Sequence, residues 1–172
     1  MQRNLLLVFL VAGIFAFPGI SNLAYAEAEI SQPAPSLAAP ELDGTAFDLG
    51  ALKGKVVIVH FWATWCPSCR EEMGILDAFY RKNHARGVEV IAPSVDKSRK
   101  RDEVRDTMKS VAFPAILLDD ATVNDFGKPG AIPVTYIIDG QGILRARLTP
   151  DQQIMTEKEL SDIVEPLIGK DD

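Results

Sequence analysis

A β-branched apolar run that ends just before two cysteines is the most constraining feature of this sequence. Residues 55–62 read Lys-Val-Val-Ile-Val-His-Phe-Trp. They lack the alternation of apolar and polar residues typical of a half-exposed strand, so they predict a central strand covered on both faces. Cys66 and Cys69 follow, and Pro67 stands at a favourable first position for a helix. The sequence therefore predicts a strand that leads into a helix, with both cysteines at the junction.

The rest of the chain alternates strand and helix patterns. Met73, Leu76 and Phe79 fall at helical spacing, so the first helix is expected to run from Pro67 to near Gly87. Further patterns predict strands at 88–93, 115–118, 134–139 and 143–148, and helices at 99–110 and 156–168. The sequence thus predicts an α/β domain with helices about a central sheet.

Short motifs fix several of the connections. Residues 140–142 read Gly-Gln-Gly, a turn composition that makes the last two strands an antiparallel pair. Asp43-Gly44 predicts the turn of a small N-terminal hairpin. Thr156 and Glu159 have the spacing of a capping box at the start of the last helix.

The first 26 residues have the pattern of an export signal. Arg3 precedes an apolar run over residues 5–17, and residues 24–26 read Ala-Tyr-Ala, as at a signal-peptidase site. We expect residues 1–26 to be a signal peptide cleaved after Ala26. The alternative is an uncleaved inner-membrane anchor, although 13 apolar residues fall short of the roughly 20 that a spanning helix needs. Both readings place the domain in the periplasm.

The prolines of residues 27–36 favour an extended tether, so the folded domain is expected over residues 37–170. The chain has a formal net charge of −6. Such an acidic balance argues against nucleic acid as a partner, because binding the phosphate backbone requires a basic face.

The cysteine pair indicates redox chemistry. A disulfide that closes so short a loop would stabilise little, because the effect grows with the number of residues enclosed. Unpaired N–H groups and the positive dipole end at a helix N-terminus favour a thiolate, so Cys66 is the expected nucleophile. Cys69, one turn further on, can attack Cys66 and release whatever it has bound. A metal site of Cys66, Cys69 and His60 matches no closed four-ligand pattern, so we expect neither metal nor other cofactor.

The segment around the cysteines resembles a known family. Residues 61–69, Phe-Trp-Ala-Thr-Trp-Cys-Pro-Ser-Cys, resemble the active-site signature of thioredoxin-fold proteins. The resemblance extends over residues 34–168 and includes the segments 53–57, 69–73, 94–96, 113–114 and 131–139. With the export signal, the chain resembles the periplasmic TlpA and ResA group, relatives of the cytochrome c maturation thioredoxins. The resemblance implies a three-layer sandwich, with a mixed sheet flanked by helices and an N-terminal β-hairpin.

The same resemblance implies roles for residues around the cysteines. It implies a cis Ile132-Pro133 bond beside them, where Ile132 and Pro133 would contact an extended substrate. Glu72 matches an acidic position that influences the thiol pKa values in ResA-like proteins, although it could equally be a solvated first-turn glutamate. His60 departs from the Asp or Asn of relatives, and we interpret it as a proton relay to Cys69 or as a buried core histidine.

Two further residues complete the expected substrate face. Trp65 adjoins Cys66 and is expected at an apolar rim, whereas Trp62 is expected in the core. Pro67 lies between the cysteines, and the dipeptide there tunes the redox potential.

These residues predict an exported thiol-disulfide oxidoreductase that reduces client disulfides. By resemblance, a membrane thiol transporter would supply electrons, and clients would include apocytochrome c or copper-site assembly proteins. A disulfide oxidase or isomerase is one alternative. A thiol-based metal chaperone or binding module is another.

Overall fold

A five-stranded mixed sheet forms the centre of the computed structural model, which describes residues 30–151 and 154–169. Its order is β5-β4-β3-β7-β8, with the predicted central strand, β3, in the middle. β4 and β5 run parallel to β3, and β7 and β8 form the antiparallel hairpin that the Gly-Gln-Gly turn predicts. The strands span Val56–Phe61 (β3), Val88–Ser94 (β4), Ala115–Leu117 (β5), Val134–Ile138 (β7) and Leu144–Leu148 (β8).

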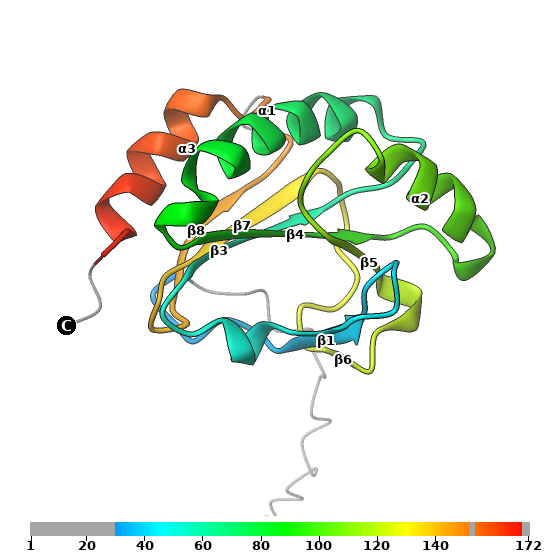
Figure 1. Ribbon diagram of the computed structural model, residues 1–172, viewed down its shortest axis with the longest axis horizontal. Coiled ribbons are helices and arrows are strands. Elements are labelled where there is room, and N and C mark those ends of the chain that lie inside the picture. The colour runs from blue at the N-terminus through cyan, green and yellow to red at the C-terminus, as the bar shows by residue number, and fades with distance from the viewer. Residues whose placement is uncertain (1–29, 152–153, 170–172) are drawn as a thin grey trace, which may run out of the picture.

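Helices cover one face of this sheet, as Figure 1 shows for α1 and α3. The helices span Pro67–Asn83 (α1), Arg101–Met108 (α2) and Glu157–Val164 (α3). Their buried side chains pack in one cluster with Val56 and Ile58 of β3. Because successive side chains of a strand point to opposite faces, His60 lies on this helix side, two positions beyond Ile58.

A second, three-stranded sheet packs on the other face. It comprises β1 (Leu37–Pro40), β2 (Ala46–Asp48) and β6 (Val123–Asn124) in the order β2-β1-β6. Gly44, at φ +96°, makes the predicted turn between β1 and β2. The hairpin is thus confirmed, and pairing with β6 turns it into a layer of its own, as seen at the bottom of Figure 1.

The N-terminal segment attaches earlier than residue 37. The Ser31 N–H donates to the Leu144 carbonyl and the Ala34 N–H to the Gly142 carbonyl. The described part of the expected tether therefore lies along the β7–β8 hairpin. The expected signal peptide lies outside the described residues. Within the described ranges, no helix has the length and apolarity to cross a membrane.

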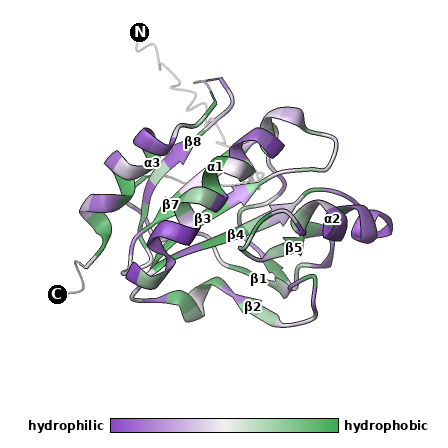
Figure 2. Ribbon diagram, turned by 45° about the horizontal axis from the view of Figure 1, so that its top comes forward, coloured by the Kyte–Doolittle hydropathy of each residue, from purple (hydrophilic) through white to green (hydrophobic). Residues whose placement is uncertain are grey.

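The last helix begins as the sequence predicts but ends sooner. The Thr156 hydroxyl accepts a hydrogen bond from the Glu159 N–H at 3.2 Å, one half of the expected capping box. The α-helix stops at Val164 and continues as a 3-10 turn over Glu165–Leu167. Pro166 explains the difference, because proline lacks the N–H that a continued α-helix needs. Figure 2 shows α3 with hydrophobic and hydrophilic sides.

Candidate active site

The two cysteines lie where β3 passes into α1. Cys66 is the residue that caps α1, and its Sγ accepts a hydrogen bond from the Cys69 N–H at 3.2 Å. A disulfide joins the pair, with the Cα atoms 5.3 Å apart. Cys66 is 5% exposed and Cys69 is fully buried. Of the two cysteines, Cys66 therefore has the greater exposure to solvent.

The environment of Cys66 favours a thiolate once the disulfide is reduced. The Cys69 N–H already points at Cys66 Sγ, and the positive end of the α1 dipole lies at the same place. Ser68 Oγ lies 3.6 Å from the same sulfur and supplies a second hydrogen-bonding group. These contacts stabilise negative charge on Cys66, which is the requirement for nucleophilic attack at neutral pH.

A buried carboxylate holds the loop that carries Cys66. Asp96, just beyond β4, accepts hydrogen bonds from the Thr64 N–H at 2.8 Å and the Thr64 hydroxyl at 3.0 Å. Its second partner is the Ser94 hydroxyl, also at 2.8 Å. Charged acceptors make the stronger hydrogen bonds in proteins. Asp96 therefore fixes the backbone two residues before Cys66. No role was predicted for Asp96 from the sequence, although Ser-Val-Asp after an apolar strand is a pattern that could have indicated one.

His60 lies in the core on the helix side of the sheet. Its Nδ1 lies 2.9 Å from Thr135 Oγ1, on the residue directly opposite in β7. Its Nε2 has no hydrogen-bond partner among the described residues. Burial lowers the pKa of His60 to about 4, and the nearby backbone of Cys69 opposes this shift. The imidazole is therefore neutral at pH 7, with one nitrogen uncommitted.

Glu72 is buried beside His60. Its Oε1 accepts a hydrogen bond from the Met155 N–H at 3.0 Å, and its Oε2 lies 3.8 Å from His60 Nδ1. Burial raises the pKa of Glu72, and the negative charges of Glu159 and Glu71 raise it further. The hydrogen bond from the Met155 N–H lowers this pKa and so opposes part of the shift. Because His60 is neutral, this contact is not an ion pair at pH 7. The structure thus excludes a solvated first-turn glutamate and puts Glu72 one turn beyond Cys69.

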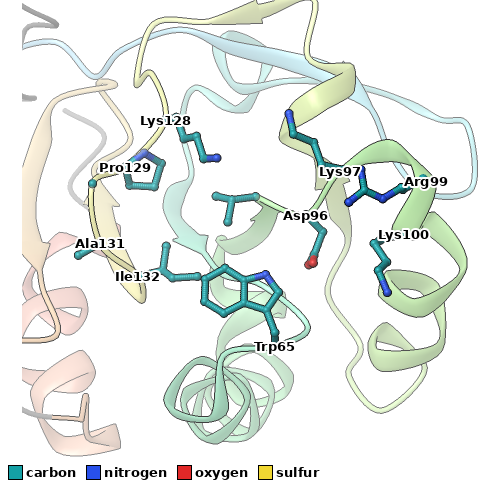
Figure 3. Close-up of a pocket in the computed structure, with 11 residues that line it drawn as sticks. Trp65, Asp96, Lys97, Arg99, Lys100, Lys128, Pro129, Ala131 and Ile132 are labelled. Atoms are coloured by element: carbon teal, nitrogen blue, oxygen red, sulfur yellow. The ribbon is translucent and has the colours of Figure 1, made fainter.

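The remaining predicted residues differ in exposure, with Trp65 and Pro67 exposed and Pro133 buried. Trp65 is 67% exposed, whereas Trp62 is fully buried and donates its indole N–H to the Ala92 carbonyl. The Ile132-Pro133 bond is cis, as the resemblance implied. Trp65 and Ile132 line one pocket of about 530 Å³, in which Figure 3 shows them side by side. Pro67 is exposed and begins α1.

Two residues of the buried cluster escaped the sequence analysis. Thr135 is the hydroxyl partner of His60, and Met155 supplies the backbone N–H that Glu72 binds. Across residues 30–151 and 154–169, no group of three or more His, Cys, Asp or Glu side chains is arranged to hold a metal ion.

Comparisons with known proteins agree with this geometry. The model of the AhpC/TSA family matches residues 30–147. The thiol-disulfide oxidoreductase ResA of Oceanobacillus iheyensis is 30% identical over 161 residues, which are 88% of this chain and 83% of the relative. The thioredoxin fold and the thiol-disulfide oxidoreductase activity that the resemblance implied are confirmed.

Two solved structures share the fold. A thiol:disulfide interchange protein of the thioredoxin family from Chlorobium tepidum has a TM-score of 0.68 and 25% identity, over 82% of this chain and 99% of the other. A secreted thiol-disulfide isomerase from Corynebacterium glutamicum has a TM-score of 0.65 and 26% identity, over 77% and 83%.

The buried His60 should make stability depend on pH. Between about 6.5 and about 4, the unfolded chain binds a proton that folded His60 does not, so stability falls as the pH falls through this window. We expect wild type to lose about 3 kcal/mol relative to His60→Asn between pH 7 and pH 4, measured by urea unfolding.

The comparison of wild type with His60→Asn must be separated from the effect of Glu72 and from the effect of any His→Asn substitution. The raised pKa of Glu72 acts in the opposite sense, with stability lost as pH rises, but it is present in both proteins. His84→Asn, which removes the half-exposed histidine, controls for the substitution itself. A difference between wild type and His60→Asn that stays constant with pH would contradict a buried neutral imidazole.

Removing the Asp96 carboxylate should loosen the loop before Cys66. Asp96→Ala leaves the Thr64 N–H and two hydroxyls without their acceptor, at a cost of about 2–3 kcal/mol. We expect faster hydrogen exchange at the Thr64 amide and lower stability to urea. The control is Asp125→Ala, which removes an exposed carboxylate. Unchanged protection of the Thr64 amide would show that other contacts hold the loop.

Proposed function

We propose that this chain, which belongs to the AhpC/TSA family and is a thiol-disulfide oxidoreductase of thioredoxin fold, reduces disulfides of exported proteins. The observation that carries the proposal is the asymmetry of the pair. Cys66 is the more exposed of the two, at 5%, and its Sγ accepts a hydrogen bond from the Cys69 N–H, whereas Cys69 is fully buried. Disulfide exchange with a client needs such an outer nucleophile with an inner thiol behind it, and the reductive direction is the one proposed here.

The reaction consists of two exchanges. The Cys66 thiolate attacks one sulfur of the client disulfide, which breaks the client S–S bond and leaves a mixed disulfide and a client thiolate. The Cys69 thiolate then attacks Cys66 Sγ, and the second client sulfur leaves as a thiolate. The client disulfide gains two electrons, and the pair ends as the Cys66–Cys69 disulfide seen here.

We assign His60 and Glu72 to the proton that Cys69 must lose in the second exchange. The Cys69 side chain is buried, so water does not reach it freely. Neutral His60 has an Nε2 without a hydrogen-bond partner in the described part of the chain, and it lies close to the Cys69 backbone. Glu72, 3.8 Å from His60 Nδ1, provides a second proton-holding group. The pair supplies a buried route for the proton.

The rim residues are proposed to position the client. Trp65 offers an exposed aromatic face beside Cys66, and Pro67 lies exposed between the cysteines. Ile132 and the buried Pro133 would border the other side of the bound segment. This places the client disulfide between the α1 N-terminus and the start of β7.

The cellular setting is also a proposal. An export signal over residues 1–26 supports a periplasmic location, with or without an N-terminal anchor. A reductant in an oxidising compartment must be reduced again, so we propose a membrane thiol donor. By family resemblance, its clients are exported proteins such as apocytochrome c or copper-site assembly factors.

The reduction potential of the cysteine pair tests the direction of electron flow. We expect a value near or below about −240 mV, from Trp65 fluorescence or thiol alkylation in a dithiothreitol and glutathione series. A Cys66→Ser/Cys69→Ser variant supplies the baseline. A value near about −120 mV, where strong periplasmic oxidants lie, would replace the proposed reductase with a disulfide-forming enzyme.

The role of His60 is tested on the second exchange alone. We expect His60→Asn to slow the release of client from the mixed disulfide about tenfold. The expected effect is smaller than for a base whose pKa is near 7, because the pKa of His60 is about 4. The change should alter the pH profile of this step while leaving attack by Cys66 unaffected. Rapid-quench alkylation measures both steps, and Glu72→Gln provides the companion variant. An unaltered profile in both variants would make the pair purely structural.

A further inference from the structure

A pocket beside the cysteines is lined by basic side chains. Four cationic residues contribute to it, and we call this surface the basic groove: Lys97, Arg99, Lys100 and Lys128. Trp65 and Ile132 form part of the same lining. Figure 3 shows Lys128 reaching in from the loop of Pro129 and Ala131, opposite the segment of Lys97 to Lys100. Two separate loops thus bring positive charge to one concave surface, on a chain whose net charge is −6.

Two of these cations are uncommitted. Lys97 pairs with Asp119 at 2.8 Å and Lys100 pairs with Glu103 at 2.5 Å. Within the described part of the chain, Arg99 and Lys128 have neither an ion pair nor a side-chain hydrogen bond, and both are exposed. Their charge is available to a bound molecule.

The one acidic residue of the lining does not cancel this charge for a ligand. The Asp96 carboxylate already accepts hydrogen bonds from Thr64 and Ser94 and is buried. Its oxygens therefore face the loop that they hold. The open side of the groove presents Arg99 and Lys128.

The groove lies where a client must lie. Trp65 is the neighbour of Cys66, and Ile132 precedes Pro133, so both sides of the proposed client position are also walls of the groove. Among the described residues, no backbone hydrogen bond engages Ala131 or Ile132. An extended polypeptide bound along this loop could pair with that backbone while its side chains enter the groove.

We propose that the basic groove binds an acidic, extended segment of the client next to the disulfide that Cys66 attacks. This inference rests on the proposed function and specifies its substrate class. Charge complementarity with Arg99 and Lys128 selects Asp or Glu in the segment. The groove also lies beside Trp65 and therefore near Cys66. A client polypeptide can place its acidic side chains in the groove and its disulfide at Cys66 at the same time, which a free anion cannot do.

The test compares two oxidised peptides that carry the same Cys-x-x-Cys disulfide. One has Asp and Glu in its flanks and the other has Asn and Gln. Stopped-flow mixing with the reduced protein gives the second-order rate constant for each. We expect the acidic peptide to react about fivefold faster at low ionic strength, with the ratio approaching one in roughly 1 M salt.

Charge reversal identifies the surface responsible. Arg99→Glu/Lys128→Glu should remove or invert the preference for the acidic peptide. The matched control, Lys53→Glu/Lys109→Glu, makes the same change in net charge away from the groove, because Lys53 precedes β3 and Lys109 lies at the other end of α2 from Lys100. The control should keep the preference. Reaction with a small uncharged disulfide should be equal in all three proteins, which verifies an intact cysteine pair.

The outcomes separate the two proposals. Equal rates for the two peptides, or a preference that persists in Arg99→Glu/Lys128→Glu, would overturn the acidic-segment inference and leave the reductase function intact. Inorganic phosphate is also added to both reactions. If it slows the two peptides equally, the groove binds free anions, and the acidic-segment inference is overturned. Failure to reduce either peptide would count against the proposed function itself.

Discussion

The junction between β3 and α1 is the constraint on which the site depends. β3 is hydrogen-bonded to β4 on one side and β7 on the other, and every one of its residues is buried. Its end can therefore shift only if the whole sheet shifts. α1 starts six residues beyond Phe61, so the helix N-terminus and its free N–H groups are held at the carboxyl end of β3. The reactivity of Cys66 thus follows from packing far from the sulfur.

The buried polar residues beside the cysteines, His60 and Glu72, destabilise the fold unless they form hydrogen bonds. An unpaired polar group in the core loses its hydrogen bonds to water without replacement. His60 Nδ1 is paired with the Thr135 hydroxyl from β7, and Glu72 with the Met155 N–H just before α3, whereas His60 Nε2 has no partner among the described residues. Residues of β3, β7, α1 and the segment before α3 thus meet at a cluster that an apolar core would not need. Since apolar side chains could fill this space, the presence of two titrating groups is in keeping with the role proposed for them at the buried Cys69 thiol.

Local patterns predicted the parts of the structure that depend on neighbours in sequence. The apolar run of β3, Pro67 at the start of α1 and Gly44 in the hairpin each act within a few residues. The contacts that define the site join residues that lie far apart in the sequence. Glu72 could equally have been solvated, because its partner Met155 lies 83 residues away. Asp96 and Thr64 are 32 residues apart, and the two-residue β6 has no periodicity to detect.

The elements that hold the two sulfurs differ from the loops that form the basic groove. The sheet and α1 hold the sulfurs, whereas loops at the end of β4 and before β7 supply the groove. With Cys66 only 5% exposed, a client disulfide gains little contact from the sulfur itself. Affinity must then come from the surroundings, and exposed charges act over several ångströms before contact is made. A basic groove on an acidic protein therefore raises the rate of productive encounter with an acidic segment, and it does so through loop residues distinct from the strand and helix that hold the cysteine pair.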